Sequence, residues 1–190
     1  MSGESAVAVV FVMLQFGLLL AIASAFFWSP FGTRLWPRIV GSVVGASGFI
    51  PIVAGALEFQ AVNARPASVL PLPTDEAQLV TSGIWRYVRH PLYLGVLLVA
   101  VGLCVCHQNW PPFVLWAALL LVLLGKARFE ESLLTTAFPS QYPLYREQTS
   151  MLVPLPCCCR YSGSLPDGDT AGCGTKEAGS ASVTPQHLGP

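Results

Sequence analysis

Charged side chains are scarce in this chain of 190 residues. Lys, Arg, Asp and Glu make up 11% of it, whereas they make up about 25% of ordinary soluble proteins. Hydrophobic residues reach 53%, and the mean hydropathy is +0.59. The ten basic and ten acidic residues cancel, but they are segregated in the loops, so the zero net charge itself says nothing useful about partners, and nucleic acid is not an expected one. This composition excludes an ordinary soluble domain and predicts a membrane protein with no nucleic-acid partner.

Cysteine is present, but not in the pattern of a metal site or of a disulfide framework. Cys104 and Cys106 lie in an apolar run, where we expect them to pack as small apolar side chains. Cys157, Cys158 and Cys159 are adjacent, and adjacent thiols alone cannot enclose a tetrahedral metal ion. We therefore expect no metal, and the position of this triplet after the last apolar segment suits S-palmitoylation.

Four apolar runs predict membrane helices. Residues 6–28 and 39–57 contain no charged residue and are close to the roughly 20 residues that span a bilayer. Residues 92–106 and 113–125 are shorter, and a polar turn closed by two prolines, 107–112, separates them. The first run follows no positively charged segment, so we expect a retained helix rather than a signal peptide. The predicted fold class is all-α, a polytopic integral membrane protein with about four transmembrane helices and a C-terminal helical hairpin.

These runs divide the chain into three parts. We expect two N-terminal transmembrane helices in residues 1–60 and a core that contains the hairpin in residues 61–156. Residues 157–190 are rich in Gly, Ser, Thr and Pro, which predicts a disordered tail. If the N-terminus is cytosolic, eight of the ten Lys and Arg residues are cytosolic and only Arg34 and Arg38 are not. We expect that orientation.

Two charged clusters flank the hairpin. Residues 86–90, RYVRH, precede it, and residues 126–131, KARFEE, follow its second apolar run. A hairpin returns to the face that it left, so the two clusters should be neighbours at one membrane face. Because 13 residues form only about 20 Å of helix, Lys126 and Arg128 should lie at or below the headgroups, where charges are functional candidates. The alternative is that both are stop-transfer residues that snorkel and pair with the following glutamates.

The dipeptide His90-Pro91 also admits two interpretations. Proline at the first helical position is an ordinary start signal. However, the amides of Leu92 and Tyr93 would then have no partner within the helix, and the positive end of the helix dipole would make them a seat for an anion.

Three other features have simpler explanations. Gly41, Gly45 and Gly48 predict a small-residue face that lets helices approach closely. His107 is expected in the turn at the tip of the hairpin, away from both charged clusters. Glu58 either joins the site or is solvated at the end of its helix, and the sequence leaves both open.

The residues around the hairpin resemble the signatures of the isoprenylcysteine carboxyl methyltransferase family, which has phospholipid methyltransferases among its relatives. The first motif is residues 79–95, LVTSGIWRYVRHPLYLG. The second is a series of spaced residues, namely Lys126, Arg128, Glu130, Glu131, Leu134, Phe138, Tyr142, Tyr145 and Pro154.

The match has a few departures from the family signatures. Ile84 and Trp85 replace a Pro-Tyr pair, and Pro139 replaces a glycine. Lys126 stands where eukaryotic prenylcysteine enzymes carry arginine, so a bidentate grip on a carboxylate is lost.

The resemblance implies a membrane-embedded methyltransferase that uses S-adenosyl-L-methionine and lacks a Rossmann fold. It implies that Lys126 or, less favoured by register, Arg128 orients the acceptor group. The cofactor-binding residues that it implies are Leu79, Val80, Trp85, His90, Pro91, Leu92, Tyr93, Glu130 and Glu131. The expected location is the endoplasmic reticulum membrane if the protein is eukaryotic, with the site facing the cytosol.

The expected partner is a lipid-like or prenylated acceptor in the membrane. If a carboxylate is methylated, an anion and a cation neutralise one another in the transition state, and a dry site favours that reaction without a general base. Two alternatives remain. Membrane sterol and steroid reductases that use NADPH contain a similar Arg-His-Pro-x-Tyr stretch, and a non-catalytic protein can retain the fold.

Overall fold

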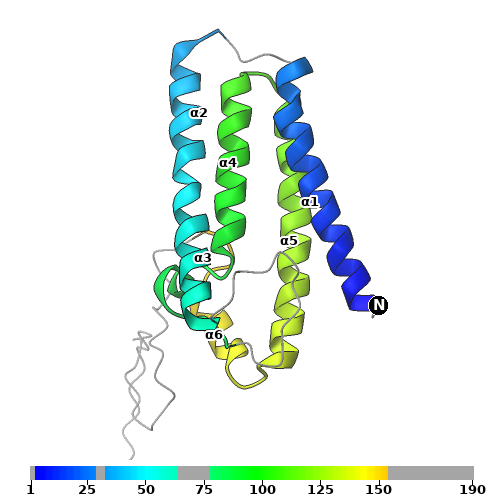
Figure 1. Cartoon of the computed structure of the whole chain (residues 1–190), viewed down its shortest axis with the longest axis vertical. Coiled ribbons are helices and arrows are strands. Elements are labelled where there is room, and N and C mark those ends of the chain that lie inside the picture. Colours follow the sequence, from blue (N-terminus) through cyan, green and yellow to red (C-terminus); the bar gives the residue numbers. More distant parts are fainter. Residues whose placement is uncertain (1–2, 29–32, 64–77, 154–190) are drawn as a thin grey trace, which may run out of the picture.

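The computed structural model describes residues 3–28, 33–63 and 78–153, and Figure 1 shows them as a bundle of long helices. The helices are α1 (Gly3–Trp28), α2 (Leu35–Ser47), α3 (Phe49–Asn63), η1 (Gly83–Arg86), α4 (Pro91–His107), α5 (Pro111–Ala137) and α6 (Tyr142–Gln148). Among these residues there is no β-strand, only an isolated bridge between Val88 and Ser150. The predicted all-α fold is confirmed. The predicted tail and the cysteine triplet lie outside the described residues.

Within the described parts of the chain, three helices are long and apolar enough to cross a membrane. They are Ser5–Ala25, the continuous pair α2 and α3 (Leu35–Asn63), and α5 (Pro111–Ala137). The fourth, α4, is apolar but has 17 residues, which is about 26 Å of helix against a hydrocarbon thickness of about 30 Å. The hairpin is therefore asymmetric, because α5 is 27 residues long and extends well beyond its apolar run.

The turn at the tip of the hairpin follows the rules of helix termini. Gln108 adopts a left-handed conformation at the end of α4, with φ of 58°, and α5 begins with Pro111. His107 is buried at the last position of α4, with 1% of its surface exposed, rather than in the turn itself.

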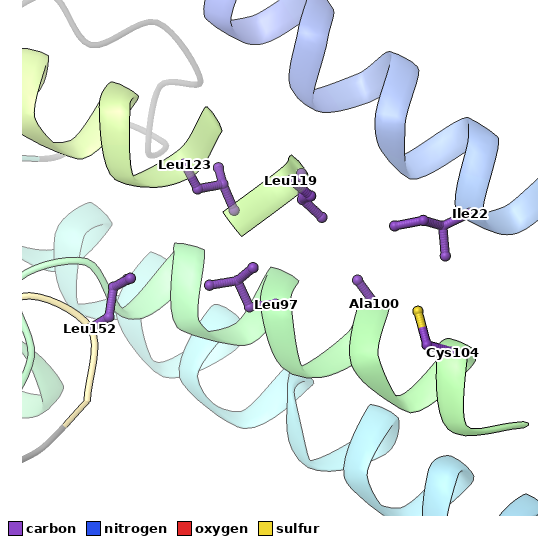
Figure 2. Close-up of a cluster of buried hydrophobic side chains, with 7 residues drawn as sticks. All are labelled: Ile22, Leu97, Ala100, Cys104, Leu119, Leu123 and Leu152. Carbon is purple, nitrogen blue, oxygen red and sulfur yellow. The ribbon is translucent and has the colours of Figure 1, made fainter. Parts of the chain in front are cut away.

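Helix α4 is central in the bundle. It packs against α2 and α3 on one side and against α5 and α1 on the other, as Figure 1 shows. Figure 2 shows buried apolar side chains between α1, α4 and α5, among them Ile22, Leu97 and Leu119. These contacts hold the two arms of the hairpin at a fixed spacing, so the charged residues at their ends are held as well.

Glycines bring α2 and α4 into direct backbone contact. A Cβ atom at Gly102 would lie 2.5 Å from the carbonyl oxygen of Gly41 and from the amide nitrogen of Gly45. At Gly95 it would lie 2.4 Å from the carbonyl oxygen of Gly48. The predicted small-residue face is therefore present, and α4 supplies matching glycines.

The functional end of the bundle is the one at the bottom of Figure 1. There the end of α3, η1, the start of α4, the end of α5 and α6 gather, and α1 begins at the same end. The two charged clusters that flank the hairpin thus lie at one end of the bundle, as the sequence predicts.

We expect Gly102→Ala to destabilise the bundle by about 1–3 kcal/mol, because the added methyl group has no space between the two backbones. Thermal unfolding of the detergent-solubilised protein measures this effect. Gly17→Ala is the matched control, since a Cβ atom there meets nothing within 4 Å. Equal melting temperatures for the two variants would contradict the close α2–α4 contact.

Candidate active site

The two glutamates of α5 meet the histidine that precedes α4. His90 Nδ1 lies 3.5 Å from Glu130 Oε2, and His90 Nε2 lies 3.5 Å from Glu131 Oε1. His90 is buried with 6% of its surface exposed, and Glu131 with 4%. One imidazole therefore faces two carboxylates that are 40 and 41 residues away along the chain, and the hairpin brings them together.

Arg89 completes this ionic cluster on its other side. Its Nε atom donates to Glu131 Oε1 at 2.8 Å, and its Nη1 atom donates to the carbonyl oxygens of Arg146 (2.8 Å) and Thr149. Arg146 adds a more exposed contact, with its Nε atom 3.6 Å from Glu131 Oε2. Glu131 is thus the centre of the cluster, where it contacts Arg89 and His90 before α4 and Arg146 on α6.

Glu130 contacts Tyr93 in the first turn of α4. The hydroxyl of Tyr93 donates to Glu130 Oε1, and the Tyr93 ring stacks on the His90 ring with centroids 5.3 Å apart. The side chain of Glu130 is 17% exposed, more than that of Glu131 at 5%. Glu130 is therefore the carboxylate that a bound molecule reaches more easily.

Lys126 is buried one turn of α5 before these glutamates. Its surface is 1% exposed, and its Nζ atom lies 5.0 Å from the centre of the Tyr93 ring. Nζ also donates to Gln15 Oε1 on α1, at 3.1 Å. Arg128 is exposed, since two residues along a helix turn the side chain through about 200°. Arg128 thus lies on the outer face of α5, whereas Lys126 is held inside the bundle.

The segment before η1 is positioned by α3. The side-chain amide of Asn63 pairs with the backbone of Gln78, and Ser82 Oγ donates to Glu58 Oε1. Gly83 has a φ of 54°, and a Cβ atom there would lie 2.8 Å from the Glu58 carboxylate. Glu58 therefore positions the segment that leads into η1.

Leu79, Val80 and Trp85 belong to this same region and lie on the α3 side of the site. Val80 is buried with 5% exposed, and Leu79 is half-buried. Trp85 Nε1 donates to the carbonyl oxygen of Gly55 at 3.1 Å, and the Trp85 carbonyl accepts from the Tyr145 hydroxyl at 2.6 Å. The hydrogen bonds of Trp85 thus run to α3 and α6 rather than to the carboxylates.

The segment after α6 closes over the start of α4. The amide of Arg89 donates to the carbonyl of Ser150 at 2.8 Å, and the amide of His90 donates to that of Met151 at 3.1 Å. This two-bond ladder is an unexpected part of the site. The spaced tyrosines of the second motif give a signal for α6, but a single sequence gives none for this pairing.

Three buried polar atoms around the cluster have no hydrogen-bond partner among the described residues. They are His90 Nε2, the Tyr142 hydroxyl and Thr149 Oγ1. Buried polar groups in folded proteins are almost always paired, with protein, water or ligand. His90 Nε2 retains only the 3.5 Å charge contact with Glu131 Oε1, so its hydrogen-bonding capacity is not met by the described residues.

An apolar cleft of about 250 Å³ opens between α4 and α5. Its wall consists of aliphatic and aromatic side chains from α4, α5 and the last described segment: Leu94, Leu97, Leu98, Val101, Trp116, Leu120, Leu152 and Val153. Leu94 lies one turn after Pro91, so the cleft begins close to the ionic cluster. The site thus combines a polar end with an apolar wall.

Residues 68–141 match the model of the family described as phospholipid methyltransferase. The chain is also similar to the protein-S-isoprenylcysteine O-methyltransferase of Schizosaccharomyces pombe, at 33% identity over 78 residues. That match covers 40% of this chain and 33% of the relative, so the chain spans about a third of the curated relative's length. No solved structure matches the chain significantly. These matches confirm the predicted family resemblance.

Glu131→Gln is expected to destabilise the protein by roughly 3–5 kcal/mol, because it leaves the buried Arg89 guanidinium without its carboxylate. Arg146→Gln is the control, since Arg146 is 59% exposed and such a pair contributes at most about 1 kcal/mol. Chemical denaturation in detergent measures both. A small effect of Glu131→Gln would show that the cluster does not stabilise the fold.

The pKa of His90 is the basis of a pH prediction. Burial lowers this pKa, but the hydrogen-bonding and charge contacts with Glu130 and Glu131 outweigh burial and raise it above the ordinary value. The stabilisation from protonated His90 is therefore complete below its ordinary pKa of about 6.5 and is lost as the pH rises through the higher, folded-state value.

We accordingly expect the melting temperature to fall as the pH rises above about 6.5, the pKa of an unperturbed histidine. His90→Gln should flatten this part of the profile, because glutamine does not titrate. An unchanged pH profile in His90→Gln would assign the effect to another group.

Proposed function

We propose that this chain is a membrane-embedded methyltransferase that uses S-adenosylmethionine to methylate a carboxylate, or another polar group, on an apolar, lipid-like acceptor. The observation that carries the proposal is the convergence of His90 and Tyr93 on the carboxylate pair of α5, with the buried Lys126 beside the Tyr93 ring. The resemblance to methyltransferases over residues 68–141 supports it.

The residues present fit the chemistry of S-adenosylmethionine, which carries a carboxylate, an ammonium, a ribose and a sulfonium methyl group. The amides of Leu92 and Tyr93 at the start of α4 have no carbonyl partner within the helix and can receive a carboxylate. Glu130 can accept a hydrogen bond from an ammonium or from a ribose hydroxyl. His90 Nε2 makes only the 3.5 Å charge contact with Glu131, so it can also take part in binding a polar group of the cofactor.

The cofactor supplies an electrophilic methyl group, and the protein's task is to align an acceptor with it. In this proposal Lys126 holds the anionic group of the acceptor near the Tyr93 ring. The apolar wall of the cleft takes the hydrocarbon part of the acceptor and keeps water away. Because a carboxylate is already a nucleophile, the residues need only position it, and no proton has to be removed.

The proposal also includes an orientation. The site end of the bundle contains Arg86, Arg89, Lys126, Arg128 and Arg146. The other end contains Arg34 and Arg38. The excess of basic residues supports a cytosolic site, and in a eukaryotic cell the family resemblance supports the endoplasmic reticulum membrane.

The test is transfer of a labelled methyl group from S-adenosylmethionine by the purified protein in lipid nanodiscs. The acceptors are a total lipid extract and a short prenylcysteine analogue. We expect label in an apolar product, and Glu130→Gln should lower the rate at least about tenfold, because it removes a charged hydrogen-bond partner of the cofactor.

Glu147→Gln is the matched control, since Glu147 is exposed on α6. It should retain the wild-type rate. Absence of transfer to either acceptor, or binding of NADPH in place of S-adenosylmethionine, would contradict the proposal.

A further inference from the structure

Gln15 is an isolated polar residue in an apolar helix. Every other residue from Ala6 to Ala23 is apolar. The Gln15 side chain is turned into the bundle with 6% of its surface exposed, whereas its neighbours Leu14 and Phe16 are 48% and 52% exposed. A glutamine near the middle of a membrane helix is costly unless it has a partner.

Packing alone does not account for a glutamine at this position. Ala8, Gln15 and Ile22 are spaced by seven residues and form the buried stripe of α1, with 0%, 6% and 0% of their surfaces exposed. Figure 2 shows Ile22 of this stripe pointing toward α4 and α5. An aliphatic residue at the middle position would bury as well as its two neighbours do, so the amide must have another use.

That use is a contact with the buried lysine. Gln15 Oε1 accepts a hydrogen bond from Lys126 Nζ at 3.1 Å, across 111 positions of sequence. The same Nζ lies 5.0 Å from the centre of the Tyr93 ring, whose hydroxyl donates to Glu130. A single series of contacts therefore runs from α1 through Lys126 and α4 to the carboxylate pair.

We infer that Gln15 is a positioning residue, which fixes the ammonium of Lys126 beside Tyr93 so that it meets the polar group of the acceptor. A lysine side chain rotates about four bonds, and a hydrogen bond to a fixed oxygen on a second helix limits the conformations that it can adopt. This inference rests on the proposed function for its catalytic consequence. It extends the site to α1, outside the residues 68–141 that match the methyltransferase family.

Three variants test the inference. Gln15→Met keeps the size of the side chain and removes the oxygen that accepts the hydrogen bond from Lys126, whereas Gln15→Glu keeps such an oxygen. Leu20→Met is the control, since Leu20 lies on the same helix and is 70% exposed. We expect Gln15→Met to lower kcat/KM for the acceptor about tenfold, the typical effect of losing one charge-assisted hydrogen bond, while the Kd for S-adenosylmethionine stays within about twofold. Gln15→Glu should retain most of the wild-type value.

A second measurement does not depend on activity. The chain has two lysines, Lys126 and Lys176, so labelling by a membrane-permeant amine reagent is read for each by peptide mass spectrometry. We expect the ratio of Lys126 to Lys176 labelling to rise severalfold in Gln15→Met, because the amine is released and deprotonates more often, and to stay unchanged in Leu20→Met.

The outcomes separate this inference from the proposed function. An unchanged labelling ratio and an unchanged kcat/KM in Gln15→Met would overturn the inference. So would a lower melting temperature with kcat/KM intact, since Gln15 would then only fix the register between α1 and α5. If the wild type transfers no methyl group but the labelling ratio rises, the proposed function fails and the placement of Lys126 by Gln15 is supported.

Discussion

The structure depends on ionic contacts between the start of α4 and the second half of α5. Arg89 and His90 contact Glu130 and Glu131 where the bundle excludes most water. A buried charge that lost its partner would destabilise the folded protein, so these contacts are needed for the fold. The hairpin between them has an apolar interior and a tight turn at Pro111. Packing can therefore fix the end of the hairpin that contains the turn, while ionic contacts fix the end that contains His90 and Glu131.

Close helix packing makes this arrangement rigid. The glycine contacts between α2 and α4 hold α4 against the α2–α3 span, and the α3 end in turn holds the segment before η1 through Glu58 and Trp85. The helices that pair their backbone groups within the membrane thus also position the polar residues at one end of the bundle.

The sequence predicts the features that depend on local rules. Charge scarcity and apolar runs identify the membrane helices, and Pro91 and Pro111 mark where α4 and α5 begin. The juxtaposition of His90 with the carboxylates follows from the topology of a hairpin. The partner of Lys126 does not follow, because apolar residues surround Gln15 on all sides of α1 and the sequence pattern does not show which side is buried. The two backbone hydrogen bonds from Arg89 and His90 to Ser150 and Met151 likewise form only when segments distant in the sequence come together, and the periodicity of the sequence does not predict this pairing.

We propose that the residues flanking the hairpin hold one cofactor molecule between them. Ultraviolet crosslinking of radiolabelled S-adenosylmethionine to the purified protein, followed by peptide mapping, tests this most directly. We expect label on peptides that contain residues 85–93 or 126–131, and loss of that label with excess S-adenosylhomocysteine. Label confined to other peptides, or label that the competitor does not displace, would contradict it.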